Sequence, residues 1–222
     1  MDIIYILYSL TASPRGSISP QNIITTLGDI TTLNCSALGG PSNSFQWERN
    51  GIPIENDSML TLEGINASHG GTYTCIISNA AGNDSVSTTL YVAPYIDTPL
   101  EEQTLAENGS NVNIVCTAAG FPIPNVIWVN ALGSDISNTS LLQFSPVIFG
   151  DEGSYCCVAT IEINEVMFLA TNETILIGML YQLDSLLVLS YNAYLFYMQF
   201  LQKVVLLYCL WISLAILMIM SH

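Results

Sequence analysis

Basic side chains are almost missing from this sequence. Arg15, Arg49 and Lys203 are the only arginines and lysines, they stand against eighteen acidic residues, and the 222-residue chain has a formal net charge of −15. Nucleic acids are bound through clusters of lysine and arginine, and a strongly negative protein repels a phosphate backbone. The composition therefore excludes nucleic acid as an expected partner.

Histidine is nearly as scarce, which removes the commonest group for acid–base catalysis. His69 falls in a predicted turn and His222 is the last residue, so a Ser-His-Asp arrangement would depend on His69 alone. Neither a phosphate-binding loop motif nor a dinucleotide fingerprint occurs. The acidic pair Glu101 and Glu102 lacks the D-x-D spacing of a calcium loop. We expect no enzymatic activity, no cofactor and no metal site.

Cysteine is present, but without the spacing of a metal site. There is no C-x-x-C pair and no matching histidine spacing among the six cysteines, which are Cys35, Cys75, Cys116, Cys156, Cys157 and Cys209. Disulfides are the better use of these residues, and disulfides persist in oxidising compartments. The cysteines therefore predict a secreted or cell-surface protein.

Glycosylation sequons indicate the same compartment. Seven asparagines begin an N-x-S/T sequon: Asn34, Asn56, Asn66, Asn83, Asn108, Asn138 and Asn172. Polar turns and strand edges produce such triplets by chance, but the composition alone would give only about three. We therefore predict N-glycosylation at these asparagines.

Most of the chain consists of two β-rich repeats. From 19 to 93, short runs rich in Thr, Ile, Val and Leu are broken by turn clusters such as "GGPSNS" and "AAGND", and the same layout recurs from 94 to 177. Repeats of about 80 residues built this way predict small antiparallel β-sandwiches. We expect an all-β protein with one domain at 19–93 and a second at 94–177, joined by the short, stiff linker "VAPYIDTP".

Residues 1–18 precede the first repeat and include an apolar run of the length found in signal peptides. Asp2 stands where a basic region is typical of such signals. The segment is expected to be a weak or truncated signal.

A hydrophobic tail, predicted to be helical, follows at 178–222. Its last run, at 204–220, has the length that a bilayer requires and is a candidate transmembrane helix. The preceding run, "LLVLSYNAYLFYMQFL" at 186–201, is interrupted by Asn192 and Gln199, so it could lie at a membrane interface or form the other leg of a hairpin.

Two other interpretations of the tail stay open. Lys203 lies on the side that the positive-inside rule does not favour if the repeats face outward. A lipid-anchor signal would also end in a short apolar run, although no polar spacer precedes it. A mistranslated extension would likewise give an apolar tail without motifs.

Both repeats share one spacing of cysteine, tryptophan and tyrosine. A tryptophan follows the first cysteine by twelve residues and a Tyr-x-Cys comes later, as Cys35, Trp47 and "TYTC" and then as Cys116, Trp128 and "SYCC". The first repeat also contains "LTLEGINASHGGTYTC", and the second contains "CTAAGFPIPNVIW" and "LQFSPVIFGDEGSYCC". With these motifs the chain resembles the immunoglobulin superfamily, in particular its I-set modules. Such modules are common in adhesion molecules, receptor ectodomains and giant muscle proteins.

The resemblance implies a set of structural residues. They are the disulfide pairs Cys35–Cys75 and Cys116–Cys157, the core tryptophans Trp47 and Trp128, and the corner tyrosines Tyr73 and Tyr155. The corner tyrosine lies two residues before the bonded cysteine, and side chains alternate along a strand, so Tyr155 selects Cys157 and leaves Cys156 on the opposite face. Cys156 and Cys209 are then expected to be unpaired thiols. Cys156 could join two chains, meet Cys209, or stay inert under its neighbours.

The sequence departs from the family pattern at two turns. His69 stands where the family usually has Asp, whereas the second repeat keeps Asp151, which is expected to cap nearby backbone amides. The last hairpin of the second repeat reads "TIEINEV" and lacks the Asn and Gly that the first repeat has there. We expect that hairpin to be built differently.

The resemblance implies binding rather than chemistry. We expect a cell-surface recognition or adhesion protein whose extracellular Ig-like domains bind a protein ligand, homophilically or heterophilically, with the tail as a single-pass anchor. Without an anchor the protein would be secreted, and a disulfide-linked dimer is one option. Alternative functions are a structural Ig-array spacer of the cytoskeleton or a fragment of a larger receptor.

Overall fold

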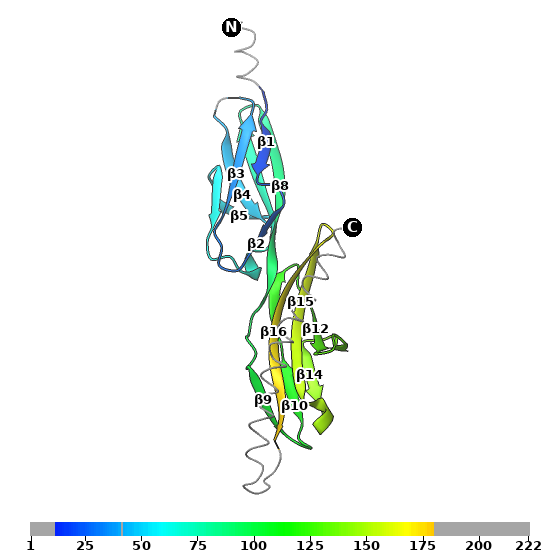
Figure 1. Cartoon of the computed structure of the whole chain (residues 1–222). Helices are drawn as coiled ribbons and strands as arrows, with labels where there is room; N and C mark the ends of the chain where they lie inside the picture. Colours follow the sequence, from blue (N-terminus) through cyan, green and yellow to red (C-terminus); the bar gives the residue numbers. More distant parts are fainter. Residues whose placement is uncertain (1–11, 41, 180–222) are drawn as a thin grey trace. The chain divides into compact units, whose positions relative to one another are not determined.

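The computed structural model describes residues 12–40 and 42–179. The weak signal segment up to residue 11 and the hydrophobic tail from residue 180 lie outside the described residues. Within the described part, no helix is long and apolar enough to cross a membrane. The elements there are strands and two short 3₁₀ helices, which confirms the all-β prediction. The chain divides into two compact units between Ala93 and Pro94, and Gly120–Pro122 is grouped with the first (Figure 1).

The first domain consists of two antiparallel layers. One sheet has the order β1-β3-β6. The other has the order β11-β8-β7-β4-β5, in which β11 (Ala118–Phe121) comes from later in the chain and β2 pairs in parallel with β8. The elements are β1 (Arg15–Ser19), β2 (Ile23–Thr25), β3 (Thr31–Leu38), β4 (Ser44–Arg49), β5 (Ile52–Glu55), β6 (Met59–Leu62), η1 (Ala67–His69), β7 (Gly71–Asn79) and β8 (Gly82–Ile96).

The second domain repeats this plan. Its smaller sheet pairs β10 with β14, and its larger sheet has the order β13-β12-β15-β16-β9, in which β9 runs parallel to β16. The elements are β9 (Gln103–Glu107), β10 (Val112–Val115), β11 (Ala118–Phe121), β12 (Asn125–Asn130), β13 (Asp135–Ser137), β14 (Leu141–Phe144), η2 (Phe149–Asp151), β15 (Gly153–Ile163) and β16 (Val166–Met179).

Buried and more exposed side chains alternate along the strands of the first domain, and this alternation shows where its core lies. In β7 the side chains of Tyr73, Cys75 and Ile77 are buried, while their neighbours are more exposed. In β3 the same holds for Leu33 and Cys35. Successive side chains of a strand point to opposite faces of its sheet, so each strand contributes every second residue to the space between the sheets.

The first domain begins earlier than the predicted residue 19. Strand β1 pairs along its whole length with β3, and Ile18 is only 6% exposed. Asp84 also holds this strand, because its carboxylate accepts a hydrogen bond from the backbone amide of Gly16 at 2.7 Å. That bond and a second from the amide of Ser85 lower the pKa of Asp84. Residues 15–18 therefore pair within the first sheet, ahead of the predicted boundary at residue 19.

The closing hairpins of the two domains differ, as predicted. In the first domain Asn79 accepts hydrogen bonds from the amides of Ala81 and Gly82 through its side chain, which stabilises the turn between β7 and β8. In the second domain β15 and β16 are joined by Asn164 and Glu165, both with positive φ. Two adjacent left-handed residues are the requirement of a tight type I′ turn, which suits the twist of paired strands.

Candidate functional site: the disulfide cores and the outward sheet faces

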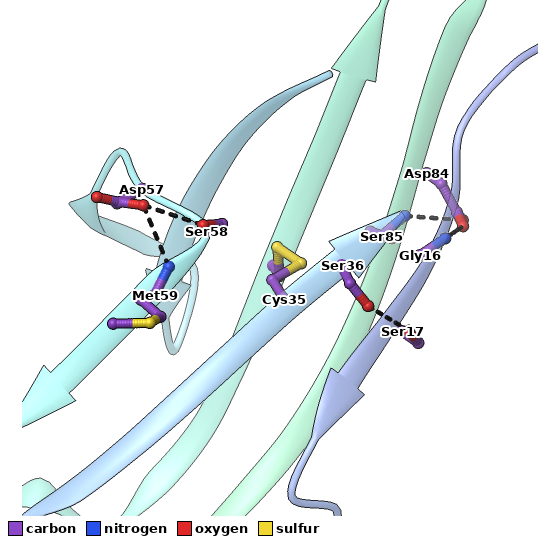
Figure 2. The surroundings of a disulfide bond; sticks show 10 residues. Gly16, Ser17, Cys35, Ser36, Asp57, Ser58, Met59, Asp84 and Ser85 are labelled. Carbon is purple, nitrogen blue, oxygen red and sulfur yellow. Dashed lines mark hydrogen bonds between the residues drawn. A yellow bond between two sulfur atoms is a disulfide. The ribbon is translucent and has the colours of Figure 1, made fainter. Parts of the chain in front are cut away.

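A disulfide between Cys35 and Cys75 joins the two sheets of the first domain. Its S–S distance is 2.04 Å, its Cα atoms are 6.4 Å apart, and Trp47 beside it is fully buried. Figure 2 shows this bond behind strand β3, with the hydroxyl groups of Ser17 and Ser36 meeting on the solvent side at 2.8 Å. The predicted pairing is confirmed.

The second domain uses the second of its two adjacent cysteines. Cys116 bonds to Cys157, with Cα atoms 6.4 Å apart, and both side chains are fully buried. Trp128, also fully buried, donates a hydrogen bond from Nε1 to the carbonyl of Ser140 at 3.3 Å. Strand alternation therefore selected the correct cysteine.

Tyr73 and Tyr155 form equivalent corners. The hydroxyl of Tyr73 donates to the carbonyl of His69 at 2.7 Å, and that of Tyr155 donates to the carbonyl of Asp151 at 2.6 Å. Burial raises the pKa of Tyr73, and burial together with the charge of Asp151 raises the pKa of Tyr155 to about 12. Each hydroxyl therefore stays protonated and donating at physiological pH.

Arg49 reinforces the corner of the first domain. Its Nη2 donates to the carbonyls of Ser68 and Gly70, the second at 3.0 Å, and its guanidinium lies 5.8 Å from the centre of the Tyr73 ring. A lone arginine at the end of a strand carries no spacing signal, so this role of Arg49 could not be predicted from the sequence.

Cys156 lies on the face opposite the disulfide, as predicted, but it is not accessible. Only 2% of the residue is exposed, and its sulfur contacts the carbonyl of Cys157 at 3.7 Å. A buried sulfur cannot reach a second chain, so the expectation that Cys156 could join two chains is wrong for this conformation. Its suggested partner Cys209 lies outside the described residues.

The seven sequons lie in two kinds of environment. The side chains of Asn34, Asn56, Asn83, Asn108 and Asn138 are exposed, whereas those of Asn66 and Asn172 are half-buried. Asn66 accepts hydrogen bonds from the amide and hydroxyl of Ser68 as the N-cap of η1. Asn172 lies opposite Cys157 in the sheet, on the side that faces the core.

The outward face of the larger sheet of the first domain is polar. Register places Glu48, Thr74 and Ser87 in one row across β4, β7 and β8. The hydroxyls of Thr74 and Ser87 meet at 2.9 Å. A shallow hollow at this sheet is lined by Gln46 and Asn56, whose side chains are hydrogen-bonded at 3.3 Å. This face can offer hydrogen-bonding groups to another surface.

Two disulfide-bonded antiparallel sandwiches, each with a buried tryptophan and a tyrosine corner, define immunoglobulin-like domains. A family model described as immunoglobulin domain matches residues 13–79 and 93–160, which is more than half of the chain. The chain therefore belongs to the immunoglobulin domain family.

Curated relatives are much longer than this chain. Neural cell adhesion molecule 1 of Mus musculus is 29% identical over 180 residues, which cover 68% of this chain and 16% of that protein. Hemicentin-1 of Mus musculus is 31% identical over 165 residues, which cover 62% of this chain and 3% of that protein. The chain thus spans less than a fifth of either relative.

Solved structures show the same fold. The insect immune protein hemolin matches with a TM-score of 0.51 at 22% identity, over 76% of this chain and 47% of hemolin. A structure reported as the basis for Dscam isoform specificity matches with a TM-score of 0.53 at 24% identity, over 76% of this chain and 46% of that chain.

Proposed function

We propose that this chain is an extracellular recognition or adhesion protein that acts by binding another protein and not by catalysis. The observation that carries the proposal is the pair of disulfides through the two cores. Such bonds form and persist in the secretory pathway and outside the cell, whereas the cytosol keeps thiols reduced. A cytoskeletal spacer would fold in the reducing cytosol, where two such disulfides would not persist.

The properties of the surface also support an extracellular location. Five of the seven sequon asparagines are exposed, where an attached glycan would meet solvent and would not disturb packing. With a net charge of −15, a glycosylated surface discourages nonspecific association. Binding would then depend on a local patch of a sheet face or on the loops, which can vary without disturbing the core.

A relative supports adhesion as the biological role. Neural cell adhesion molecule 1 of Mus musculus is an adhesion molecule by name, and it matches this chain across both domains. We propose that the ligand is a protein, with a second immunoglobulin-like chain as the first candidate.

We also propose that the run at 204–220 anchors the protein in a membrane with the two domains outside the cell. The support is the length and uninterrupted apolar character of the run in the sequence. If this anchor is absent, the same domains would act as a secreted protein.

Expression of the tagged full chain in a secretory eukaryotic cell tests the compartment and the anchor. We expect the protein in the membrane fraction and a shift to lower mass after glycosidase treatment. A soluble, glycosidase-insensitive product would contradict the proposal and favour the cytoskeletal spacer. Comparison of reduced and unreduced gels tests the dimer, which would have to use Cys209 while Cys156 stays buried.

Mixing of expressing and non-expressing cells, each labelled with its own dye, tests adhesion. Homophilic binding predicts clusters that contain only expressing cells, whereas a heterophilic ligand on the host cell predicts mixed clusters. Dispersed cells in which the protein is nevertheless at the surface would argue against adhesion. A matched control is the Cys116→Ala/Cys157→Ala variant, which lacks the disulfide of the second domain.

A further inference from the structure

The hollow on the outward face of the larger sheet of the first domain lies against a glycosylation sequon. Gln46 and Ile76 lie opposite each other on β4 and β7, and Ser44 and Ser78 form the next outward pair. Beyond β5, all three residues of the sequon at 56–58 line the same hollow. No other sequon contributes a residue to this lining in the described part of the chain.

The size and the lining of the hollow suit a small polar ligand. Its volume is about 630 Å³, within the range of roughly 300 to 1,000 Å³ for small-molecule sites. Ile76 contributes a half-buried apolar side chain. Amides and hydroxyls are also part of the lining, from Asn43, Ser44, Gln46, Ser58 and Ser78. A sugar ring has the matching character, because it presents C–H groups on its faces and hydroxyl groups around its edge.

Asn56 is oriented by a hydrogen bond that glycosylation would keep. The residue is exposed, and its Oδ1 accepts from Nε2 of Gln46 at 3.3 Å. An N-linked glycan is attached to Nδ2, so the side-chain carbonyl remains an acceptor. The bond from Gln46 therefore fixes the plane of the Asn56 amide, and the first sugar extends from the other branch of that amide at the hollow.

The rest of this sequon is held by local hydrogen bonds. The carboxylate of Asp57 accepts from the amide of Met59 at 3.3 Å and from the hydroxyl of Ser58 at 3.1 Å (Figure 2). Bonds from Met59 and Ser58 lower the pKa of Asp57. The carbonyl of Ser58 accepts from the amide of Cys35 at 2.7 Å. A sugar attached to a segment held in this way costs little further backbone ordering when it packs.

Asn34 offers the same chemistry on a different surface. It is exposed on the outward face of the smaller sheet, where Ser19 and Met59 lie opposite it on the neighbouring strands. None of these three residues lines the hollow. A glycan on Asn34 would extend into solvent, so this sequon is an internal reference for the one at Asn56.

We propose that Asn56 carries an N-linked glycan whose first sugar packs into the hollow and becomes a structural part of the first domain. The inference rests on the extracellular, glycosylated state proposed above. A sugar held there covers this part of the sheet face, and it leaves the remaining surface to the protein ligand.

Enzymatic release of the glycans from the native full chain, made in a secretory eukaryotic cell, tests the packing. An amidase that cleaves the bond between asparagine and the first sugar leaves an aspartate, so mass spectrometry follows each sequon separately. We expect release at Asn56 to be at least about fivefold slower than at Asn34, the effect of about one net hydrogen bond. After denaturation the two rates should agree. Equal rates in the native chain would overturn the proposal.

Two variants on β7 separate the hollow from the surrounding sheet. Ile76→Ala removes the apolar side chain from the lining and should bring the release rate at Asn56 close to that at Asn34. Thr74→Ala changes the previous outward residue of the same strand, which lies outside the hollow, and should leave the ratio of rates unchanged. Unchanged tryptophan fluorescence shows that each variant is folded. A ratio that Ile76→Ala does not alter would contradict the packing.

Thermal unfolding gives a second readout that leaves the protein part of the hollow intact. Trimming of all glycans to a single sugar should not change the unfolding temperature of the first domain, whereas complete release should lower it. Asn56→Gln should reproduce this loss, while the matched Asn34→Gln variant should not. A loss on trimming, or equal behaviour of the two variants, would rule out a structural role for the first sugar on Asn56.

The two proposals fail in different ways. Glycans at other sequons with Asn56 unmodified would overturn this inference and leave the adhesion proposal standing. A chain without any glycan would contradict both proposals. Cells that stay dispersed while the glycan on Asn56 is protected would remove only the adhesion proposal.

Discussion

The residue four positions before each corner tyrosine shows how two different side chains perform one task. In the first domain Nδ1 of His69 accepts a hydrogen bond from the amide of Asn66 at 3.1 Å. In the second, Oδ2 of Asp151 accepts from the amide of Ile148 at 2.9 Å, which confirms its predicted role as a cap. Both close the first turn of a short 3₁₀ helix, where orphaned amides need an acceptor. The departure at His69 therefore keeps the function of the family's aspartate.

Replacement of Tyr155 by Phe should lower the unfolding free energy of the second domain by about 1 kcal/mol, because the variant loses one buried hydrogen bond. Urea denaturation followed by tryptophan fluorescence measures this change. No loss of stability would show that the hydroxyl bond to Asp151 is compensated by water.

The same variant should change the behaviour of the protein at alkaline pH. The pKa of Tyr155 is raised to about 12 in the folded state, so the fold favours the protonated hydroxyl. Its contribution to stability is complete below pH 10, the ordinary pKa of tyrosine, and declines as the pH rises from 10 towards 12. The difference between the ultraviolet titrations of the two proteins should show a group that ionises well above pH 10. A midpoint near 10 would contradict the assigned burial.

At the scale of elements, the two domains close their last hairpins by different means. The first uses the side chain of Asn79 to hold a turn, while the second uses a two-residue turn at Asn164 and Glu165. Asparagine tolerates positive φ better than most residues, whereas glutamate has no such preference. The tight turn joins the long strands β15 and β16, and β15 carries Cys157 of the core disulfide.

Glu165→Gly should stabilise the second domain by up to about 1 kcal/mol, because glycine adopts φ near the observed 67° without steric cost. Glu162→Gly is the matched control, since Glu162 is exposed within β15, and there glycine should be destabilising by about 0.5 to 1 kcal/mol. Thermal unfolding of the full-length variants distinguishes the two. A loss of stability in both would show that the turn does not limit the hairpin.

A prediction about the start of the first domain follows from the position of β1. Ile18→Ala should destabilise this domain by about 2 kcal/mol, because Ile18 is buried between the sheets. Ser17→Ala on the solvent side of the same strand should have little effect. Chemical denaturation checks both variants. An unchanged Ile18→Ala midpoint would favour the later start that the sequence alone predicted.

For the whole molecule, charge is the dominant surface property. The eighteen acidic residues outnumber the three basic ones, so ion pairs can neutralise only a small part of the negative charge. Like charges on a compact surface repel one another, and dissolved salt screens that repulsion over distances of about 8 Å at physiological ionic strength.

Added salt should therefore stabilise the protein. We expect the unfolding temperature of the full chain to rise by a few degrees between very low salt and about 0.3 M sodium chloride, because screening reduces self-repulsion in the folded state. Differential scanning fluorimetry measures this shift. A fall over the same range would mean that specific ion pairs outweigh the net charge.

Strand-level features were predictable wherever a local rule controls them. The Cys, Trp and Tyr spacing identified both disulfides and both corners, because a cross-core bond and a strand period of two leave few alternatives. The start of β1 was missed because residues 1–18 resemble a signal segment, and only pairing with β3 distinguishes a strand there. Arg49 was missed because its acceptors, the carbonyls of Ser68 and Gly70, are distant in sequence.

By itself, the sequence determined the all-β class, the two repeats and the choice of Cys157 over Cys156, since these depend on residue spacing along a single strand. Only the tertiary structure decided that Cys156 is buried. Alternation states which face a side chain points to, but it does not state whether another layer covers that face. That decision rests on contacts between segments far apart in the chain, which no local pattern encodes.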